Sequence, residues 1–65
     1  MRINRITFNL ELLKRDLTLT ELSKASGVSR QVLSAIKSGK TCSDATGEKI
    51  ASALNVNLAD LLKEV

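Results

Sequence analysis

The most constraining feature of this chain is the tripeptide Gly27-Val28-Ser29, which separates two short segments with helical apolar spacing. Glycine adopts a positive φ without steric cost and therefore ends a helix readily, whereas a serine hydroxyl caps the first turn of the next one. Leu22 before the turn and Leu33 after it are positions through which the two helices would touch. The segment therefore predicts two short helices, at 19–25 and 30–38, joined by a tight turn.

The predicted helix starts share one local pattern. Thr18 and Glu21 form a capping box, in which a hydroxyl and a carboxylate each bind a free backbone amide of the first turn. Leu17 and Leu22 stand at the spacing of a hydrophobic staple across the same start. The staple spacing recurs at two further starts: Val28 with Leu33 around Ser29, and Val56 with Leu61 around Asn57. Three helix boundaries are thus specified by nearby residues.

The chain is expected to form one all-α domain over residues 1–65. No proline, repeat, low-complexity tract or linker interrupts the 65 residues, which favours a compact helical bundle. Apolar spacing and caps predict five helices, at about 4–15, 19–25, 30–38, 44–54 and 58–64. A domain of this size buries roughly 60% of the surface that its unfolded chain exposes, so its core must be economical.

The first helix is the one element for which two patterns compete. A helical stripe is formed by Ile6, Leu10, Leu13 and Leu17, whereas strand-like alternation is formed by Ile6, Phe8, Leu10 and Leu12. Residues 1–12 could therefore be extended, but no later segment offers a partner strand, and Leu13-Lys14-Arg15 breaks the alternation. We favour a helix with its main stripe inward. Phe8 and Leu12 then face away from that stripe, toward a second face or a neighbouring chain.

Composition excludes several classes of protein. One cysteine and no histidine leave no internal disulfide and no ordinary zinc site, and we expect neither metal nor cofactor. Paired carboxylates on one element, a phosphate-binding glycine loop and a base for Cys42 are all missing, so an enzyme is not expected. No apolar run approaches the ~20 residues that span a bilayer, and no secretory pattern opens the chain. These features predict a cytoplasmic protein without membrane contact.

Positive charge is concentrated around the predicted turn. Residues 22–43 contain four cations and no acid, Lys24, Arg30, Lys37 and Lys40, whereas residues 44–65 contain two lysines against four acids. A solvated cationic face without a partner would give the same pattern. Because the charge coincides with the turn between the two short helices, a polyanion is the favoured partner.

These residues resemble a known family. The matching positions are Leu22, Ser23, Gly27-Val28-Ser29, Leu33-Ser34, Ile36, Gly39-Lys40, Ile50-Ala51, Ala53-Leu54 and Val56. The pattern resembles the phage repressor and Cro-type helix-turn-helix family, of the xenobiotic-response-element type, over about residues 10–62. The resemblance implies a compact five-helix repressor-like bundle. It also implies a transcriptional repressor that binds double-stranded DNA, as a homodimer on a near-palindromic operator.

The third helix would be the recognition helix, with its inward side formed by Val32, Leu33 and Ile36. Family positions that touch base edges are occupied by Arg30, Gln31, Ser34 and Ala35. Arginine can pair with guanine, glutamine with adenine, and an alanine methyl group with the methyl group of thymine, whereas Ser34 adds little selectivity. Positions that often contact phosphate are occupied by Thr18, Ser29, Ser38 and Lys40. Lys37, Lys40 and the amides near Gly39 are further phosphate candidates, although Lys37 could simply complement the helix dipole.

Three positions depart from the family pattern. Leu19 stands where a glutamine commonly contacts the DNA backbone, so one phosphate contact is expected to be lost. Leu12 and Lys37 replace a common arginine–glutamate pair, and Ser43 replaces a proline as a plausible helix cap. None of these changes threatens the fold.

A domain this small offers few base contacts, so specificity would come from two copies whose recognition helices enter major grooves about 34 Å apart. Candidate interface residues are Val56, Leu58 and Leu62, which could equally belong to the core. Two alternatives remain to simple regulation. One is an antitoxin-type regulator that also binds a protein partner, and the other is an interaction module with the same fold and no DNA binding.

Overall fold

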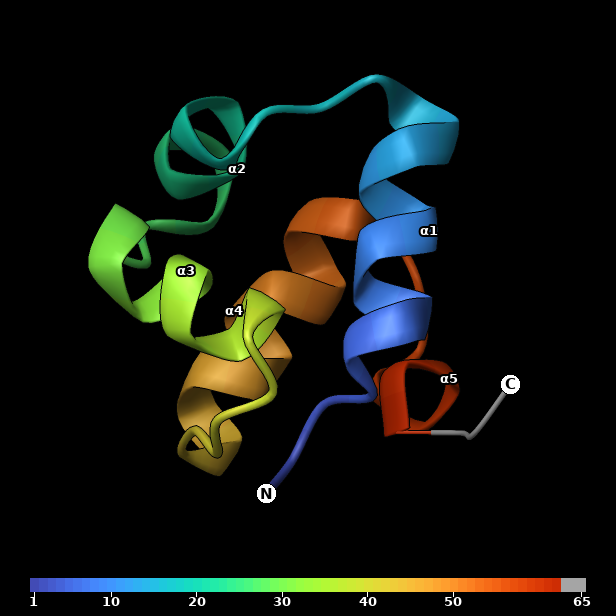
Figure 1. Ribbon diagram of the computed structural model, residues 1–65, viewed down its shortest axis with the longest axis vertical. Helices are drawn as coiled ribbons and strands as arrows, with labels where there is room; N and C mark the ends of the chain where they lie inside the picture. The colour runs from blue at the N-terminus through green and yellow to red at the C-terminus, as the bar shows by residue number, and fades with distance from the viewer. Residues whose placement is uncertain (63–65) are drawn as a thin grey trace.

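The computed structural model describes residues 1–62, and this part of the chain is entirely helical and irregular, with no strand. Its elements are α1 (Arg5–Arg15), α2 (Leu19–Ser26), α3 (Arg30–Lys37), α4 (Asp44–Leu54) and α5 (Leu58–Leu62). In Figure 1, α4 runs through the middle of the view, with α1 and α5 on one side and α2 and α3 on the other. The prediction of an all-α bundle is therefore confirmed.

The helix bounds follow the local caps. The first helix begins one residue later than expected because Asn4 is its cap: the Asn4 side chain accepts hydrogen bonds from the amides of Ile6 and Thr7, both at 3.0 Å. The capping box of α2 is present in full, with Thr18 bonded to Glu21 in both directions. Helix α3 ends at Lys37 rather than at 38. The last two residues of the range 58–64 lie outside the described residues.

Each of the four connections contains one residue with a positive φ: Asp16, Gly27, Gly39 or Asn55. Gly27 has φ 75°, and a Cβ built there would meet no atom within 4 Å, so glycine is favoured by backbone conformation alone. Asp and Asn are the other residues that tolerate this region. The turns that position the helices are therefore set by residue types that suit them.

The core joins all five helices. Its largest fully buried side chains are Ile3, Phe8, Leu22, Leu33, Ile36, Ile50, Leu54 and Leu61. Helix α2 packs against α3 and α4, and α1 packs against α3 and α5. Val28 is buried at the corner between α2 and α3. The face of α3 that carries Leu33 and Ile36 is thus fixed by the rest of the molecule.

The predicted orientation of the first helix is wrong. Phe8 is fully buried and Leu12 is 6% exposed, whereas Ile6, Leu10 and Leu13 are 52%, 41% and 75% exposed. Leu17, which follows the helix, does pack against the core as expected.

The cause lies at the start of α1. Ile3 is buried, and the amide of Asn4 donates to the carbonyl oxygen of Leu61 at 2.8 Å. These two contacts anchor the helix on α5 and set its rotation. With that rotation the large aromatic ring of Phe8 is removed from water, which stabilises the fold more than burial of an aliphatic side chain would.

A cluster of charged groups ties the end of α1 to α4. Glu11 accepts from Lys14 at 3.0 Å and from Arg15 at 2.9 Å, and Arg15 also donates to the carbonyl oxygen of Leu54 at 2.6 Å. That carbonyl is at the C-terminal end of α4, where no further helical amide follows to bind it. The Arg15 guanidinium therefore links two helix ends.

The first four residues run as an extended segment along the connection between α3 and α4. The ammonium group of Met1 donates to the carbonyl oxygen of Cys42 at 2.8 Å, and the amide of Cys42 donates to the carbonyl oxygen of Met1 at 2.9 Å. The Met1 sulfur would lie 2.5 Å from a Cβ at Gly47. Glycine in the middle of α4 therefore makes room for Met1. No helix in the described part of the chain is long and apolar enough to cross a membrane.

The orientation of α1 can be tested by two alanine substitutions. Phe8→Ala should lower the free energy of unfolding by about 3–5 kcal/mol because it empties a fully buried site, whereas Leu13→Ala should change it by at most about 0.5 kcal/mol. Urea denaturation followed by circular dichroism measures both, with Phe8→Leu as a milder variant that stays folded. Equal losses for Phe8→Ala and Leu13→Ala would mean that α1 faces the other way.

Acid should weaken the Glu11 cluster. The hydrogen bond from Lys14, followed by that from Arg15, holds the pKa of the Glu11 carboxyl below its ordinary 4.5, although partial burial opposes this. Because the folded-state pKa is the lower one, the stabilisation is present above pH 4.5 and is lost as the pH falls through the lowered pKa. Urea midpoints measured against pH should therefore decline more steeply in that range for the wild type than for Glu11→Gln. Parallel profiles would contradict the assignment.

Candidate nucleic-acid interface

The turn before α3 is held by side-chain hydrogen bonds. The hydroxyl of Ser23 donates to the carbonyl oxygen of Val28 at 2.7 Å, and the hydroxyl of Ser26 accepts from the amide of Val28 at 3.2 Å while donating to Leu22 at 2.7 Å. Ser29 then caps α3 by accepting from the amide of Val32 at 3.3 Å. The amide and the carbonyl oxygen of Val28 are thus both bonded within the chain, which holds the start of α3 in place.

Helix α3 has a buried face and an exposed face. Leu33 and Ile36 are fully buried, whereas Arg30, Gln31 and Ser34 are exposed. Ala35 is only partly exposed, at the border between the two faces. The expectation that Val32 faces inward is wrong, because its side chain is 39% exposed. Val32 therefore lies at the edge of the buried face, about 100° around the helix from Leu33.

Three predicted base-contacting residues converge on one shallow hollow. It is lined by Leu19 from the start of α2 and by Arg30, Gln31 and Ser34 from α3. The guanidinium of Arg30 donates to the hydroxyl of Thr20 through one Nη at 3.4 Å, a long hydrogen bond that leaves its other donors available. The hollow thus combines strong hydrogen-bond donors with one apolar wall.

Three of the residues predicted to contact phosphate carry a hydroxyl group, and they differ in whether the hydroxyl proton is already used in a hydrogen bond. A hydroxyl has a single proton. Thr18 already donates to Glu21 at 3.1 Å, and Ser38 already donates to Ser34 at 3.2 Å. Ser29 only accepts in its cap, so its proton is available to an anion. Ser29 is therefore the best placed of the three.

The amides near Gly39 do not form an anion site, contrary to expectation. The amide of Gly39 donates to the carbonyl oxygen of Ile36 at 2.9 Å, and that of Lys40 donates to Ala35 at 3.0 Å. Both belong to the hydrogen-bonded end of α3, where amides satisfy the last free carbonyl groups of the helix. Their donors are used in ending the helix.

The two lysine candidates have different surroundings. Lys40 is exposed just after α3. Lys37 lines a separate hollow beside α1, together with Asn9, Leu12, Leu13, Asp16 and Leu17. Asp16, an acid of the same molecule, is thus a neighbour of Lys37 in this hollow, although it forms no ion pair with it.

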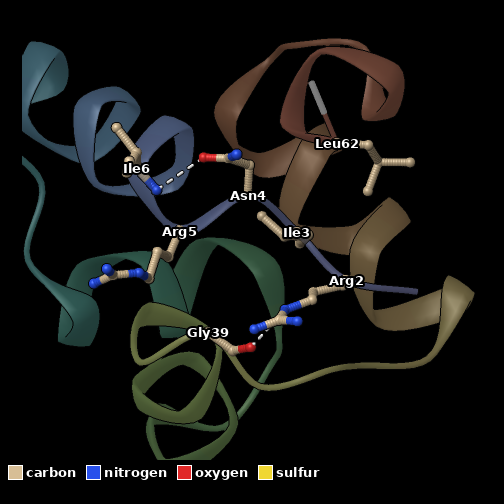
Figure 2. A pocket seen from close by; sticks show the side chains of 7 residues that line it. All are labelled: Arg2, Ile3, Asn4, Arg5, Ile6, Gly39 and Leu62. Carbon is tan, nitrogen blue, oxygen red and sulfur yellow. Dashed lines mark hydrogen bonds between the residues drawn. The ribbon is translucent and has the colours of Figure 1, made fainter. Parts of the chain in front are cut away.

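Sequence reasoning missed two arginines. Arg2 in the extended N-terminal segment and Arg5 at the start of α1 both approach Gly39 (Figure 2). Arg2 donates through Nε to the carbonyl oxygen of Gly39 at 3.0 Å. Both arginines lie more than 30 positions from Gly39 in the sequence, so no local spacing could have indicated the contact.

The remaining candidates are placed as follows. Val56 and Leu58 are partly buried and pack against the core of their own chain, whereas Leu62 is 40% exposed. Cys42 is also partly buried, and burial raises the pKa of its thiol. A raised pKa keeps the thiol protonated and unreactive. The described residues contain no cluster of side chains suited to hold a metal ion.

Comparison with known proteins agrees with this geometry. A family model described as helix-turn-helix matches residues 10–61, which include all of α2, α3 and α4. Searches of curated proteins and of solved structures gave no significant match. The family is one of DNA-binding regulators of transcription. The match covers most of the chain, and the protein belongs to the Cro/C1-type helix-turn-helix family.

Proposed function

We propose that this protein is a transcriptional repressor that reads the major groove of double-stranded DNA with α3. The observation that carries the proposal is the hollow that Leu19 forms with Arg30, Gln31 and Ser34, on a helix whose opposite face is buried. Side chains that discriminate between bases must be presented by a rigid support. Leu33 and Ile36 supply that support from the core.

Each residue of the hollow has a base that suits its chemistry. Arg30 can donate two hydrogen bonds to O6 and N7 of guanine, and Gln31 can pair in two places with adenine, each contributing about 1–3 kcal/mol of discrimination. Ser34 can bond to several bases and therefore adds little selectivity. Leu19 and Ala35 supply apolar contact for the methyl group of thymine.

Contacts with the DNA backbone would set the position of α3 in the groove. Lys40 and the hydroxyl of Ser29 are the residues best suited to hold phosphate, because both are exposed and have unused donors. Thr18 and Ser38 could contribute after exchanging an existing hydrogen bond, and Lys37 after leaving the hollow that contains Asp16. Such contacts add affinity without sequence information.

The functional unit would be a homodimer on a near-palindromic operator. The described molecule measures 25 × 24 × 20 Å, so two copies fit beside each other with recognition helices about 34 Å apart, one turn of DNA. Leu62 is the exposed member of the candidate interface, whereas Val56 and Leu58 already pack on their own core. Occupation of an operator by such a dimer would exclude other proteins from that stretch of DNA.

A regulator that also binds a protein partner is the second candidate function. One observation favours it: α1 exposes Ile6, Leu10 and Leu13 at the spacing of one helical stripe. The third possibility is an interaction module that does not bind DNA. The duplex experiment below distinguishes it from both regulators, because such a module would bind neither duplex and Arg30→Ala would change nothing.

Base reading and phosphate binding should respond differently to mutation. Sites selected from random duplex DNA provide the specific sequence, and a scrambled duplex provides the reference. Arg30→Ala should weaken binding to the specific duplex by about 1–3 kcal/mol and spare the scrambled one, because it removes contacts with base edges. Lys40→Ala should weaken binding to both duplexes alike and reduce the salt dependence of binding.

Fluorescence anisotropy at several salt concentrations measures all six affinities, those of the wild type and of both variants for each duplex. If the wild type bound both duplexes equally, base reading by α3 would be excluded. A loss confined to the specific duplex in Lys40→Ala would show that Lys40 reads bases instead.

A further inference from the structure

Two arginine side chains pass close to Gly39, two residues beyond the end of α3. The Nε of Arg2 donates to the carbonyl oxygen of Gly39 at 3.0 Å. A Cβ built on Gly39 would lie 3.5 Å from Cδ of Arg5 and 3.7 Å from an Nη of Arg2. Figure 2 shows the guanidinium of Arg2 beside Gly39, whereas the guanidinium of Arg5 extends to the other side of Gly39, away from that of Arg2. These contacts join parts of the chain that are far apart in sequence.

The backbone that carries these arginines is held on both sides. Before Arg2, the backbone of Met1 is paired with that of Cys42 through two hydrogen bonds of 2.8 and 2.9 Å. After it, Ile3 is buried and the amide of Asn4 is bonded to Leu61 at 2.8 Å. The backbone of this segment is therefore already ordered, so that binding a ligand restricts only the exposed arginine side chains, which is the advantage of a preorganised backbone.

The positive charge at this place has no acidic partner in the described part of the chain. Arg2 and Arg5 are exposed and take part in none of the ion pairs found there. No carboxylate occurs among the described residues that line the hollow beside Gly39. Arg2 uses one of its five N–H donors on Gly39, so its terminal nitrogens remain available to an anion. A cation without an acidic partner is stabilised by an anion that binds beside it.

We propose that Arg2 and Arg5 form a clamp on the DNA backbone, each binding phosphate on its own side of Gly39, at the edge of the groove that α3 enters. The inference rests on the proposed function of α3. The eight residues of α3 span about 12 Å, which is close to the width of the major groove. When the first turn of α3 touches base edges, Gly39 at its far end reaches the groove wall, where the phosphates run. Guanidinium groups bind phosphate through paired hydrogen bonds.

The clamp extends the DNA-binding surface beyond the helix-turn-helix itself. Arg30 at one end of α3 would select the base, and the two arginines at the other end would fix how deeply the helix enters. This arrangement predicts that the clamp adds affinity for every sequence and leaves the preference among sequences unchanged.

The test compares Arg5→Ala, Arg2→Ala and the double variant with Lys49→Ala, which removes an exposed charge from α4 instead. Each arginine variant should bind both the selected and the scrambled duplex about tenfold more weakly. The double variant should lower the slope of log K against log salt by about two, because two charges no longer displace counterions. Arg5→Lys should restore only part of the affinity, since an ammonium group lacks the paired geometry. Circular dichroism confirms that each variant remains folded.

Ethylation of individual phosphates on the selected duplex locates the contact. For the wild type, ethylation of phosphates at the groove edge should interfere with binding, and in the double variant that interference should disappear. If the wild type binds selectively but all the arginine variants behave like Lys49→Ala, the clamp is wrong and reading by α3 stands. If the wild type binds no duplex, the proposed function fails together with the clamp.

Discussion

The structure depends most on the turn between α2 and α3, where a change of chain direction must be made without leaving polar groups unpaired. Gly27 supplies the left-handed residue, and the hydroxyl of Ser23 binds the carbonyl oxygen of Val28. Because these needs are met within the turn, Val28 can be buried at the corner and Leu33 can be buried below it. In the described part of the chain, no buried side-chain nitrogen or oxygen atom is left without a hydrogen bond. A well-packed support of this kind keeps the outward side chains of α3 in place.

Features encoded by neighbouring residues could be predicted, and features decided by distant contacts could not. The capping box of Thr18 and Glu21 and the cap at Ser29 depend on residues three positions apart, and both are found. The rotation of α1 depends instead on a bond from Asn4 to Leu61, 57 positions away. Two apolar stripes on α1 were available, and only that anchor decides which one enters the core.

In the candidate site, too, features set by neighbouring residues could be predicted and features set by distant contacts could not. The exposure of Arg30, Gln31 and Ser34 could be predicted because the helical period places them away from Leu33 and Ile36. The surroundings of Lys37 could not, since they depend on how closely α1 approaches α3. Hydroxyl groups illustrate a third case, in which the residue is correctly placed but its proton is already used, as at Ser38. Position alone does not tell whether a group has a donor to spare.

The glycine in the middle of α4 has a consequence for engineering this domain. Replacing a helical glycine with alanine is a standard way to stabilise a protein, worth about 0.4–1 kcal/mol when the site has room. At Gly47 the side chain of Met1 occupies that room, with its sulfur 2.5 Å from where the new methyl group would lie. Thermostabilising design guided by helix propensity would there force the flexible end of the Met1 side chain to move. The Cδ1 atom of Leu58, 3.2 Å from the same position, would also have to give way.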